Sequence, residues 1–367
     1  MRKVMGLVST NYYSSEFGAL TRERPIAALP YGGRYRLVDF PLSNMINSGI
    51  NIVGLITPYM YRSLIDHLGS GNGWMLNRKV GGMFILPGSV YGYKSVRGKF
   101  ILRDLIQNRL YFERGDRELV MFSASSKVMN IDFADVVKQH EDSGADITLV
   151  CKPGYAPEHG EERYIRRSPG GRVTELTTSP DAFSACFLDA FIIDRSLLLR
   201  FADWYQALGY IDLIDIIAEN LDKVNVRCYE FGGYVGAVND ISGYMQVNRD
   251  FLDERVQHEL FLEERPIKTK ILDAAPAKYE ADSHVSNSIV STGCRIAGTV
   301  EDSLIFRGAT IERGATVKNC IIMQKTVIGA GAHLENVICD KLARIKPGVQ
   351  VCGSEDAPII VEKFSDV

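Results

Sequence analysis

The residue types that most often bind metals or act as nucleophiles are scattered along this chain of 367 residues. Its seven cysteines show no CxxC spacing, and its six histidines lie far from them. Structural zinc sites need four such ligands at characteristic spacings, and disulfide frameworks are typical of short secreted chains. The sequence therefore predicts reduced thiols, as in cytoplasmic proteins. The cysteines are Cys151, Cys186, Cys228, Cys294, Cys320, Cys339 and Cys352.

The charge balance argues against two classes of partner. Lys and Arg together number 42 against 45 Asp and Glu, which leaves a net charge of -3. No strong positive field is present to attract nucleic acid or an anionic membrane surface. The N-terminal run MRKVMGLVST turns polar too soon for a signal peptide, and no later apolar run is long enough to cross a membrane. We expect a cytoplasmic protein that binds neither nucleic acid nor membranes.

Any site in the first two thirds of the chain must be positioned by an α/β fold. The chain is long for one hydrophobic core, so two domains are expected. From Lys3 to about Phe231, short apolar runs alternate with amphipathic stretches, as in a mostly parallel sheet covered by helices. A helix is predicted over 132–144, with Asp132 as its N-cap and Gly144 as its stop. Strands are predicted over 3–8, 51–56, 118–122 and 147–151.

A different period governs the C-terminal part of the chain. Aliphatic residues recur there about every six positions, which indicates a β-solenoid that turns a corner every six residues. The alternative, a β-sandwich with regular hairpins, would show a spacing of about 8–12 residues. We expect an α/β domain over 1–255, a linker over 256–278 and the repeat domain over 279–367, packed against the α/β domain. The recurring residues are Ile289, Val300, Ile305, Ile311, Val317, Ile322, Val327, Val337, Ile345 and Val351.

One long segment links this organisation to a known family. The run LTRERPIAALPYGGRYRLVDFPLSNMINSGI, residues 20–50, closely resembles the corresponding segment of bacterial ADP-glucose pyrophosphorylases (glucose-1-phosphate adenylyltransferases). That family joins a nucleotidyltransferase domain, with a mostly parallel Rossmann-like sheet, to a C-terminal left-handed parallel β-helix of hexapeptide repeats. The resemblance implies this architecture for essentially the whole chain, in agreement with the six-residue period.

The resemblance also implies where phosphate-binding groups should stand, and several are missing. Family members open with a loop of the type GGxGxRLxxLT, whose glycines wrap the triphosphate and whose arginine faces the leaving pyrophosphate. Here Tyr12 and Tyr13 occupy the loop, and Glu16 stands at the arginine position. Bulky side chains would fill the phosphate pocket, and a carboxylate would repel the phosphate. The family's GTADA loop over the nucleotide is replaced by a segment that begins at Phe100.

The metal and sugar-phosphate positions of the family are altered as well. Its metal-binding aspartates, in motifs like AGDHIYxxD and WRDVGT, correspond to Ser126 and Ala237, and the lysine of its EKP triplet corresponds to Ser179. A hard divalent cation that is bound mainly by carboxylates would lose its site. We therefore expect a degenerate active site with no catalytic residue, no bound cofactor and no metal in this chain. Mg²⁺ is expected in a catalytic partner instead.

Three arginines are candidates for an effector site. Arg24, Arg34 and Arg36 flank the region where intact family members bind anionic activators near a subunit boundary, so they are candidates for binding a sugar phosphate. The simpler interpretation, which the sequence favours, is that they form structural ion pairs or a solvated face. Ile26 weakens the effector interpretation, because the family has a lysine there in a KPAV motif.

Taken together, these residues imply a non-catalytic or weakly active subunit that resembles the D-type subunit of the family. It would support a catalytic ADP-glucose pyrophosphorylase subunit in a hetero-oligomer, expected to be a tetramer, in glycogen biosynthesis. One alternative is an active nucleotidyltransferase with a rebuilt site that uses Asp104, Asp212, Asp215 or Asp240. Another alternative is a stand-alone sugar-phosphate sensor.

Overall fold

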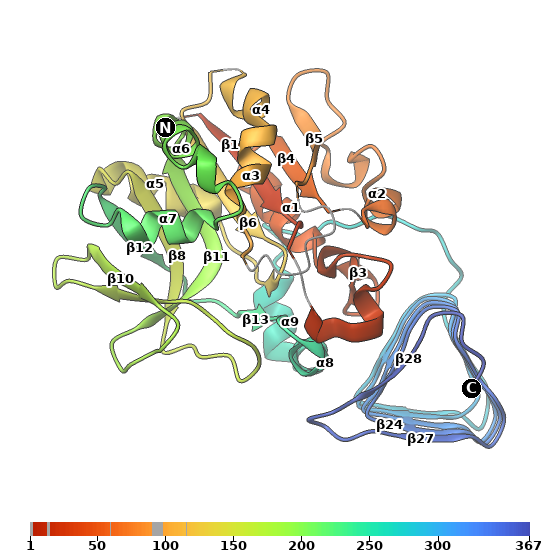
Figure 1. Cartoon of the computed structure of the whole chain (residues 1–367). Helices are drawn as coiled ribbons and strands as arrows, with labels where there is room; N and C mark the ends of the chain where they lie inside the picture. Colours follow the sequence, from red (N-terminus) through yellow and green to blue (C-terminus); the bar gives the residue numbers. More distant parts are fainter. Residues whose placement is uncertain (1–2, 13–14, 59, 90–97, 115) are drawn as a thin grey trace.

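The protein consists of an α/β unit followed by a triangular β-solenoid (Figure 1). The structure is a computed structural model, and it describes residues 3–12, 15–58, 60–89, 98–114 and 116–367. In these ranges, no helix is long and apolar enough to span a membrane. All seven cysteines are free thiols, and six of them are buried.

The described residues of the α/β unit form a nine-stranded mixed sheet. Its order is β10-β9-β11-β6-β1-β4-β5, with β8 paired to β11 and β12 paired to β8. Strands β6, β1, β4 and β5 run parallel, whereas β11 runs antiparallel to both β6 and β8. The four strands predicted from apolar runs are all present, each shifted by about one residue. The bounds are β1 Val4–Ser9, β4 Ile52–Thr57, β5 Gly82–Pro87, β6 Leu119–Ala124, β8 Ile147–Pro153, β9 Tyr164–Arg167, β10 Val173–Thr177, β11 Ala185–Asp194 and β12 Val226–Glu230.

Helices cover both faces of this sheet, because its strands carry apolar side chains on both sides. One core packs Phe122 and Phe191 against helices α3, α4, α6 and α7, and the other packs Val53 and Met121 against α1, α2 and α5. Helix α5 is Phe133–Ser143; Asp132 caps it by accepting from the Ala134 N–H at 2.8 Å, as predicted. The other bounds are α1 Asp39–Asn47, α2 Arg62–Leu68, α3 Leu102–Gln107, α4 Arg109–Glu113, α6 Arg195–Trp204 and α7 Leu213–Glu219.

The six-residue period produces three parallel sheets, one for each side of the triangle. Their orders are β14-β17-β20-β23-β26, β15-β18-β21-β24-β27 and β16-β19-β22-β25-β28. Most of the recurring aliphatic residues fill the lumen, but Ile328 points inward in place of the predicted Val327. The strands are short. Their bounds are β14 Lys278–Tyr279, β15 His284–Ser286, β16 Ile289–Val290, β17 Arg295–Ile296, β18 Thr299–Glu301, β19 Leu304–Ile305, β20 Thr310–Ile311, β21 Thr316–Lys318, β22 Ile321–Ile322, β23 Val327–Ile328, β24 His333–Glu335, β25 Val337–Cys339, β26 Arg344–Ile345, β27 Gln350–Cys352 and β28 Ile359–Val361.

One corner of the triangle is built from stacked Asn and Asp residues. Asn287, Asp302, Asn319 and Asn336 all have positive φ, between 41° and 54°, a conformation that Asn and Asp tolerate better than other side chains. Their side chains bond from coil to coil: Asn287 Nδ2 donates to Asp302 Oδ1 at 2.6 Å, and Asn319 donates to Asn336. The ladder therefore stabilises each turn through the next one.

The side β16-β19-β22-β25-β28 packs against the α/β unit. Alternate residues of its strands point into the lumen, while Leu304, Ile321 and Ile338 join a core with Phe40 and Tyr244 of the α/β unit. Charged pairs reinforce the contact: Arg22 pairs with Glu362 at 2.6 Å, Lys363 pairs with Glu23 at 2.9 Å, and buried Arg24 pairs with Asp340. The predicted packing of the repeat on the α/β domain is thus observed.

The segment between the two units differs from the expected linker. Helix α9, Glu254–Leu260, crosses the expected boundary at residue 255, because Asp253 caps it by accepting from the Arg255 N–H at 2.8 Å. Helix α8, Ile241–Asp250, precedes it, and both lie beside the solenoid-facing core. The first solenoid strand, β14, starts at Lys278, one residue before the expected domain start.

Candidate functional site

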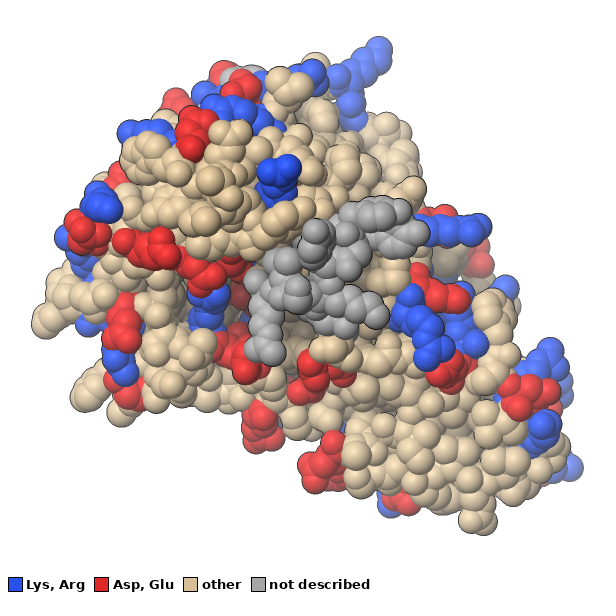
Figure 2. Space-filling model, in the orientation of Figure 1, with Lys and Arg blue, Asp and Glu red and all other residues tan. Residues whose placement is uncertain are grey.

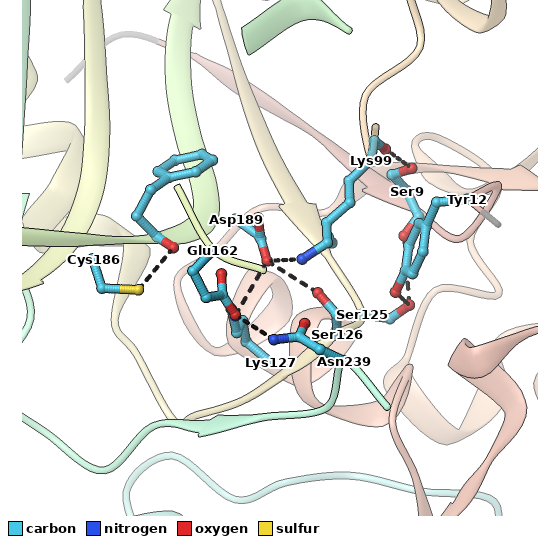
Figure 3. A network of polar contacts seen from close by, with 12 residues as sticks. Ser9, Tyr12, Lys99, Ser125, Ser126, Lys127, Glu162, Cys186, Asp189 and Asn239 are labelled. Atoms are coloured by element: carbon cyan, nitrogen blue, oxygen red, sulfur yellow. Dashed lines mark hydrogen bonds and ion pairs between the residues drawn. The ribbon is translucent and has the colours of Figure 1, made fainter. Parts of the chain in front are cut away.

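Polar side chains gather where strands β1 and β6 end. These strands are parallel neighbours, with Ser9 opposite Ala124, so the residues that follow them meet at one edge of the sheet. Tyr12 follows β1 and its hydroxyl lies 2.9 Å from Ser125 Oγ, which follows β6. Figure 3 shows that this contact borders a larger network of charged groups. This edge is the natural place for a ligand in an α/β fold.

The centre of the network is a lysine without solvent contact. Lys127 belongs to β7, Lys127–Val128, and its side chain is 0% exposed. Its ammonium forms an ion pair with Glu162, which is also buried, and lies 3.6 Å from Asp189 Oδ2. Glu162 Oε1 also accepts from Asn239 Nδ2 at 2.6 Å. The positive charge is therefore matched by protein groups and not by water.

Asp189 occupies an unusual position in the middle of strand β11. Its φ is +53°, and the pairing of β11 with β8 shifts register between Phe187 and Phe191. The bulge turns the carboxylate towards the network (Figure 3), where it accepts from Lys99 Nζ at 2.5 Å and from Ser126 Oγ at 3.1 Å. Lys99, Lys127, Glu162 and Asp189 form what we call the lysine–carboxylate cluster. It contains two cations and two carboxylates.

Neighbouring charges set the protonation states of Lys127 and Asp189. Burial acts to lower the pKa of Lys127, but the charges of Glu162 and Asp189 outweigh burial and hold that pKa above its ordinary value. Burial acts to raise the pKa of Asp189, but Lys99 and Lys127 outweigh it and hold that pKa below its ordinary value. The cluster is therefore charged but internally neutral at physiological pH. It leaves little uncompensated positive charge for a phosphate.

Two of the altered family positions lie directly beside this cluster. Ser126 donates to Asp189, and Ala237 in β13, Gly236–Ala237, pairs with Lys127 in β7. Both residues are buried. The two positions that the resemblance aligns with metal-binding carboxylates thus lie on either side of Lys127, and they carry a hydroxyl and a methyl group.

Among the described residues, the other three altered positions make no contact with the charged groups of the cluster, although Phe100 directly follows Lys99 in the chain. Phe100 is buried in the core, with its ring 5.1 Å from that of Phe191. Glu16 is exposed, and its carboxylate accepts from Ser15 Oγ at 2.5 Å. Ser179 is exposed in the loop between β10 and β11, where its N–H donates to Thr177 Oγ1 at 3.1 Å. None of these contacts places a cation where a phosphate would need one.

The carboxylates considered for a rebuilt metal site have structural partners instead. Asp212 and Asp240 cap helices α7 and α8, and Asp215 pairs with Arg163 at 2.6 Å. Asp104 accepts from the N–H and hydroxyl of Ser89, both at 2.5 Å. Across the described ranges, no group of three or more His, Cys, Asp or Glu side chains is arranged to hold a metal ion.

Tyr12 fills part of the space next to the cluster. Its hydroxyl bonds to Ser125, and burial raises its pKa, so the phenol stays neutral. In Figure 3 its ring lies next to Ser9 and Ser125. This agrees with the expected plugging of the phosphate pocket. Tyr13, the other predicted plug, lies outside the described residues.

The three candidate effector arginines divide between two environments. Arg24 is buried; it forms an ion pair with Asp340, and its Nε–H donates to the Leu20 carbonyl at 2.9 Å. Arg34 is exposed, 5.4 Å from the ring centre of Tyr35, and Arg36 donates to the Ser63 carbonyl at 2.5 Å. Arg34 and Arg36 line the same cavity, of about 310 Å³, between the two units. The structure therefore retains two of the three as candidates for anion binding.

This cavity, which we call the basic pocket, is strongly cationic. Its lining includes one carboxylate, Asp66, and Arg307 Nη1 is buried there without a hydrogen-bond partner in the described part of the chain. Basic side chains also stand on this face of the α/β unit next to the solenoid, with acidic ones among them (Figure 2). The cationic lining residues are Arg34, Arg36, Lys270, Arg307, Lys325 and Lys341.

Crowding of these cations affects their protonation. Burial, with the charges of Arg36 and Arg24, lowers the pKa of Lys341 to about 7. Burial also lowers the pKa of Arg36 to about 10. An anion in the pocket would favour the protonated form of Lys341 and relieve this repulsion. The arrangement is thus suited to bind an anion such as a sugar phosphate.

Sequence reasoning missed most of the lysine–carboxylate cluster. Lys99, Lys127, Glu162 and Asp189 are far apart in the chain and match no short motif. One signal was available: Asp189 interrupts the apolar run ACFLDAFII, where a charged residue is rarely buried without a partner. Its partners could not be identified without the strand order.

Comparisons with known proteins cover both units. A nucleotidyl transferase family model matches residues 15–192, and a model of the GlmU-like C-terminal hexapeptide matches residues 274–358, so the solenoid is a left-handed β-helix. The glycogen biosynthesis protein GlgD of Bacillus subtilis (strain 168) is 32% identical over 362 residues, 98% of this chain and 96% of the relative. GlgD of Geobacillus stearothermophilus is 36% identical over 361 residues, with the same coverage. A glucose-1-phosphate adenylyltransferase of Fervidobacterium nodosum is 28% identical, over 96% of this chain and 86% of the relative.

Proposed function

Because this chain belongs to the family of GlgD glycogen biosynthesis proteins and glucose-1-phosphate adenylyltransferases, we propose that it is a non-catalytic or weakly active regulatory subunit of ADP-glucose pyrophosphorylase. That enzyme converts ATP and glucose 1-phosphate to ADP-glucose and pyrophosphate in glycogen biosynthesis. The supporting observation is the lysine–carboxylate cluster, in which the charges at the sheet edge neutralise one another.

Nucleotidyl transfer needs the opposite arrangement. Attack on the α-phosphate concentrates negative charge, which a metal ion, cations and backbone N–H groups must offset. Here Ser126 and Ala237 stand at the metal-ligand positions, and Tyr12 occupies space next to the cluster. If each missing group removes about 3 kcal/mol of transition-state stabilisation, three independent losses slow the reaction about a millionfold. If the groups act together, removing all of them slows the reaction by less than the sum of the separate effects, but the remaining activity would still be small.

On this proposal, catalysis and its Mg²⁺ belong to a partner subunit. The partner is a catalytic ADP-glucose pyrophosphorylase subunit, and we expect the two to form a heterotetramer in the cytoplasm, in keeping with the seven free thiols. Regulation across their interface would correspond to a coupling free energy of about 1–3 kcal/mol.

The basic pocket supports a regulatory role for the chain. Six cationic side chains face one carboxylate, and a buried Arg307 nitrogen lacks a partner in the described ranges. Unpaired buried donors and crowded cations are unfavourable in the free protein, so an anion would stabilise the pocket. We propose an anionic sugar phosphate as its ligand. The pocket joins the two units, so its occupancy can bias how they pack.

The proposal is tested by assaying ADP-glucose formation by this chain alone, by a catalytic subunit from the same cell, and by the two co-expressed. We expect no turnover above background from the isolated chain and an altered rate or activator response of the catalytic subunit in the complex. Arg307→Ala in the complex should weaken the activator response, while Arg313→Ala, an exposed solenoid arginine, should not.

Two results would contradict this proposal. Mg²⁺-dependent turnover by the isolated chain at a rate comparable to the catalytic subunit would indicate a rebuilt active site. A stable homo-oligomer that binds sugar phosphate but never associates with the catalytic subunit would indicate a stand-alone sensor instead.

A further inference from the structure

The surroundings of Lys127 resemble those of a metal ion more than those of an ordinary ion pair. Oxygen atoms of Glu162 and Asp189 approach its ammonium, and Ser126 Oγ lies 3.1 Å from the same Asp189 oxygen. Asn239, which bonds Glu162 at 2.6 Å, adds an amide (Figure 3). Carboxylates are the ligands that hard divalent cations prefer, and here the hydroxyl and the amide N–H hold the two carboxylates in place by donating hydrogen bonds to them.

The position of Lys127 in the fold supports this likeness. It follows Ser126 directly and lies opposite Ala237 in the β7–β13 pair. Lys127 is therefore the neighbour of both positions that the resemblance aligns with metal-binding carboxylates. The two carboxylates that surround it come from other elements: Asp189 from the bulged strand β11, and Glu162 from the segment before β9.

Charge balance gives Lys127 a role that no neutral residue can fill. Glu162 is 2% exposed and Asp189 is 9% exposed, so neither carboxylate is well solvated. Lys99, which is 23% exposed, contacts Asp189 but has no recorded contact with Glu162. Without Lys127, a buried carboxylate would lack a counter-ion, which strongly destabilises a protein.

We propose that the Lys127 ammonium takes the place of a divalent cation, and that the carboxylates of Glu162 and Asp189, held in place by Asn239 and Ser126, will accept such a cation once the ammonium is removed. This inference rests on the proposed non-catalytic function, since it treats the sheet edge as a former metal site. It explains how the chain keeps its fold at this edge without a metal. The covalently attached cation also makes the fold independent of metal supply.

The test replaces Lys127 by Met, which has a similar length but no charge, and probes the full-length protein with MnCl₂ and MgCl₂. Binding is measured from the loss of the free Mn²⁺ signal in electron paramagnetic resonance, and stability from the melting temperature. We expect Lys127→Met to melt below the parent protein and to bind one Mn²⁺. At a metal concentration a hundredfold above the dissociation constant, its melting temperature should rise by about 3–5 °C.

Three matched proteins serve as controls. The parent protein should show no Mn²⁺ binding at this site, because the ammonium occupies it. Lys99→Met should also show none, because Lys127 remains in place. The double variant Lys127→Met/Glu162→Gln should lose the Mn²⁺ response, because one of the two carboxylates is gone. A folded Lys127→Met protein that ignores both metals would overturn the proposal, as would Mn²⁺ binding to the parent protein that Glu162→Gln abolishes.

A second comparison covers the case in which Lys127→Met does not fold. If Lys127 acts as a counter-ion, the variant Lys127→Met/Glu162→Gln/Asp189→Asn, which removes the charges together, should be recovered as folded protein when the single variant is not. Addition of MnCl₂ during refolding should rescue the single variant, whereas KCl of equal ionic strength should not. Failure of both the triple variant and the Mn²⁺ rescue would contradict the proposal. These readouts need no turnover, so they stand apart from the activity assays that test the proposed function.

Discussion

The lysine–carboxylate cluster and the basic pocket both contain basic side chains, but the charges are balanced in the cluster and unbalanced in the pocket. In the cluster, two lysines face two carboxylates, and the central lysine has no solvent contact. In the basic pocket, six cations face a single carboxylate around a cavity of about 310 Å³. Because its charges are paired within the protein, the cluster stabilises the fold. The cations of the pocket lack such partners, so the pocket favours the binding of an anion. The comparison predicts that substitutions in the cluster change stability and that those in the pocket change binding.

The largest expected effect is on folding, in the cluster. Lys127→Met leaves two buried carboxylates short of a counter-ion and should lower the free energy of unfolding by about 3–5 kcal/mol. Lys341→Met in the basic pocket removes a crowded cation and should leave that free energy unchanged or raise it. Urea denaturation of the two variants measures the difference. Equal destabilisation by both would remove the distinction between the two regions.

Arg24 provides an intermediate case, because it lies near the basic pocket but is fully paired. Arg24→Met should lower the free energy of unfolding by about 3 kcal/mol, since it leaves the buried carboxylate of Asp340 without its partner. Limited proteolysis should also become faster in the segment between α9 and β14, because one tie between the two units is lost. Arg22→Met, which removes an exposed ion pair with Glu362, is the control and should have no measurable effect. If Arg24→Met is as stable as the parent protein, Arg24 is not a structural residue, and it remains a candidate for anion binding.

The next effect is on binding alone. Arg307→Ala should weaken the binding of glucose 1-phosphate or sulfate to the isolated chain about tenfold, the loss expected for one charge-assisted hydrogen bond. Its urea midpoint should match that of the parent protein. Isothermal titration calorimetry provides the affinities. An unchanged affinity would show that the anion does not bind in the basic pocket.

The smallest expected effect concerns the pH dependence of the same binding. The pKa of Lys341 is about 7 in the free protein, and an anion favours its protonated form, so binding takes up a proton. Sulfate affinity should therefore fall as pH rises through about 7, by at most about tenfold per pH unit. Sulfate is chosen because it does not itself titrate in this range. Lys341→Met should bind sulfate with an affinity that no longer depends on pH.

Local signals in the sequence predicted local structure well. Asp132 and Gly144 mark the ends of α5, and the six-residue period predicted the solenoid down to most of its luminal residues. Ser126 and Ala237, which the resemblance aligns with metal-binding aspartates, both lie next to Lys127, because β7 pairs with β13. These successes share one property: each depends on residues that are close in sequence or aligned to a known motif.

Features that depend on long-range contacts were not predictable in the same way. The partners of Lys127 lie 35 and 62 positions away, and they meet only because β11 lies next to β6 in the sheet. Arg24 was grouped with Arg34 and Arg36 because all three flank the region where family members bind activators, but its ion-pair partner Asp340 is 316 positions away. The α/β boundary was placed too early because the charged run around residue 255 resembles a linker, although Asp253 caps a helix there.

The ion pairs between the first residues of the chain and its last coil have a consequence for biosynthesis. Arg22, Glu23 and Arg24 contact Glu362, Lys363 and Asp340, so these contacts span 316 to 340 positions. A ribosome releases the N-terminal segment long before it has made the residues that hold this segment in place. The segment must therefore stay incompletely packed until residues 340–363 have been made, and this part of the solenoid completes the packing of the α/β unit as well as its own.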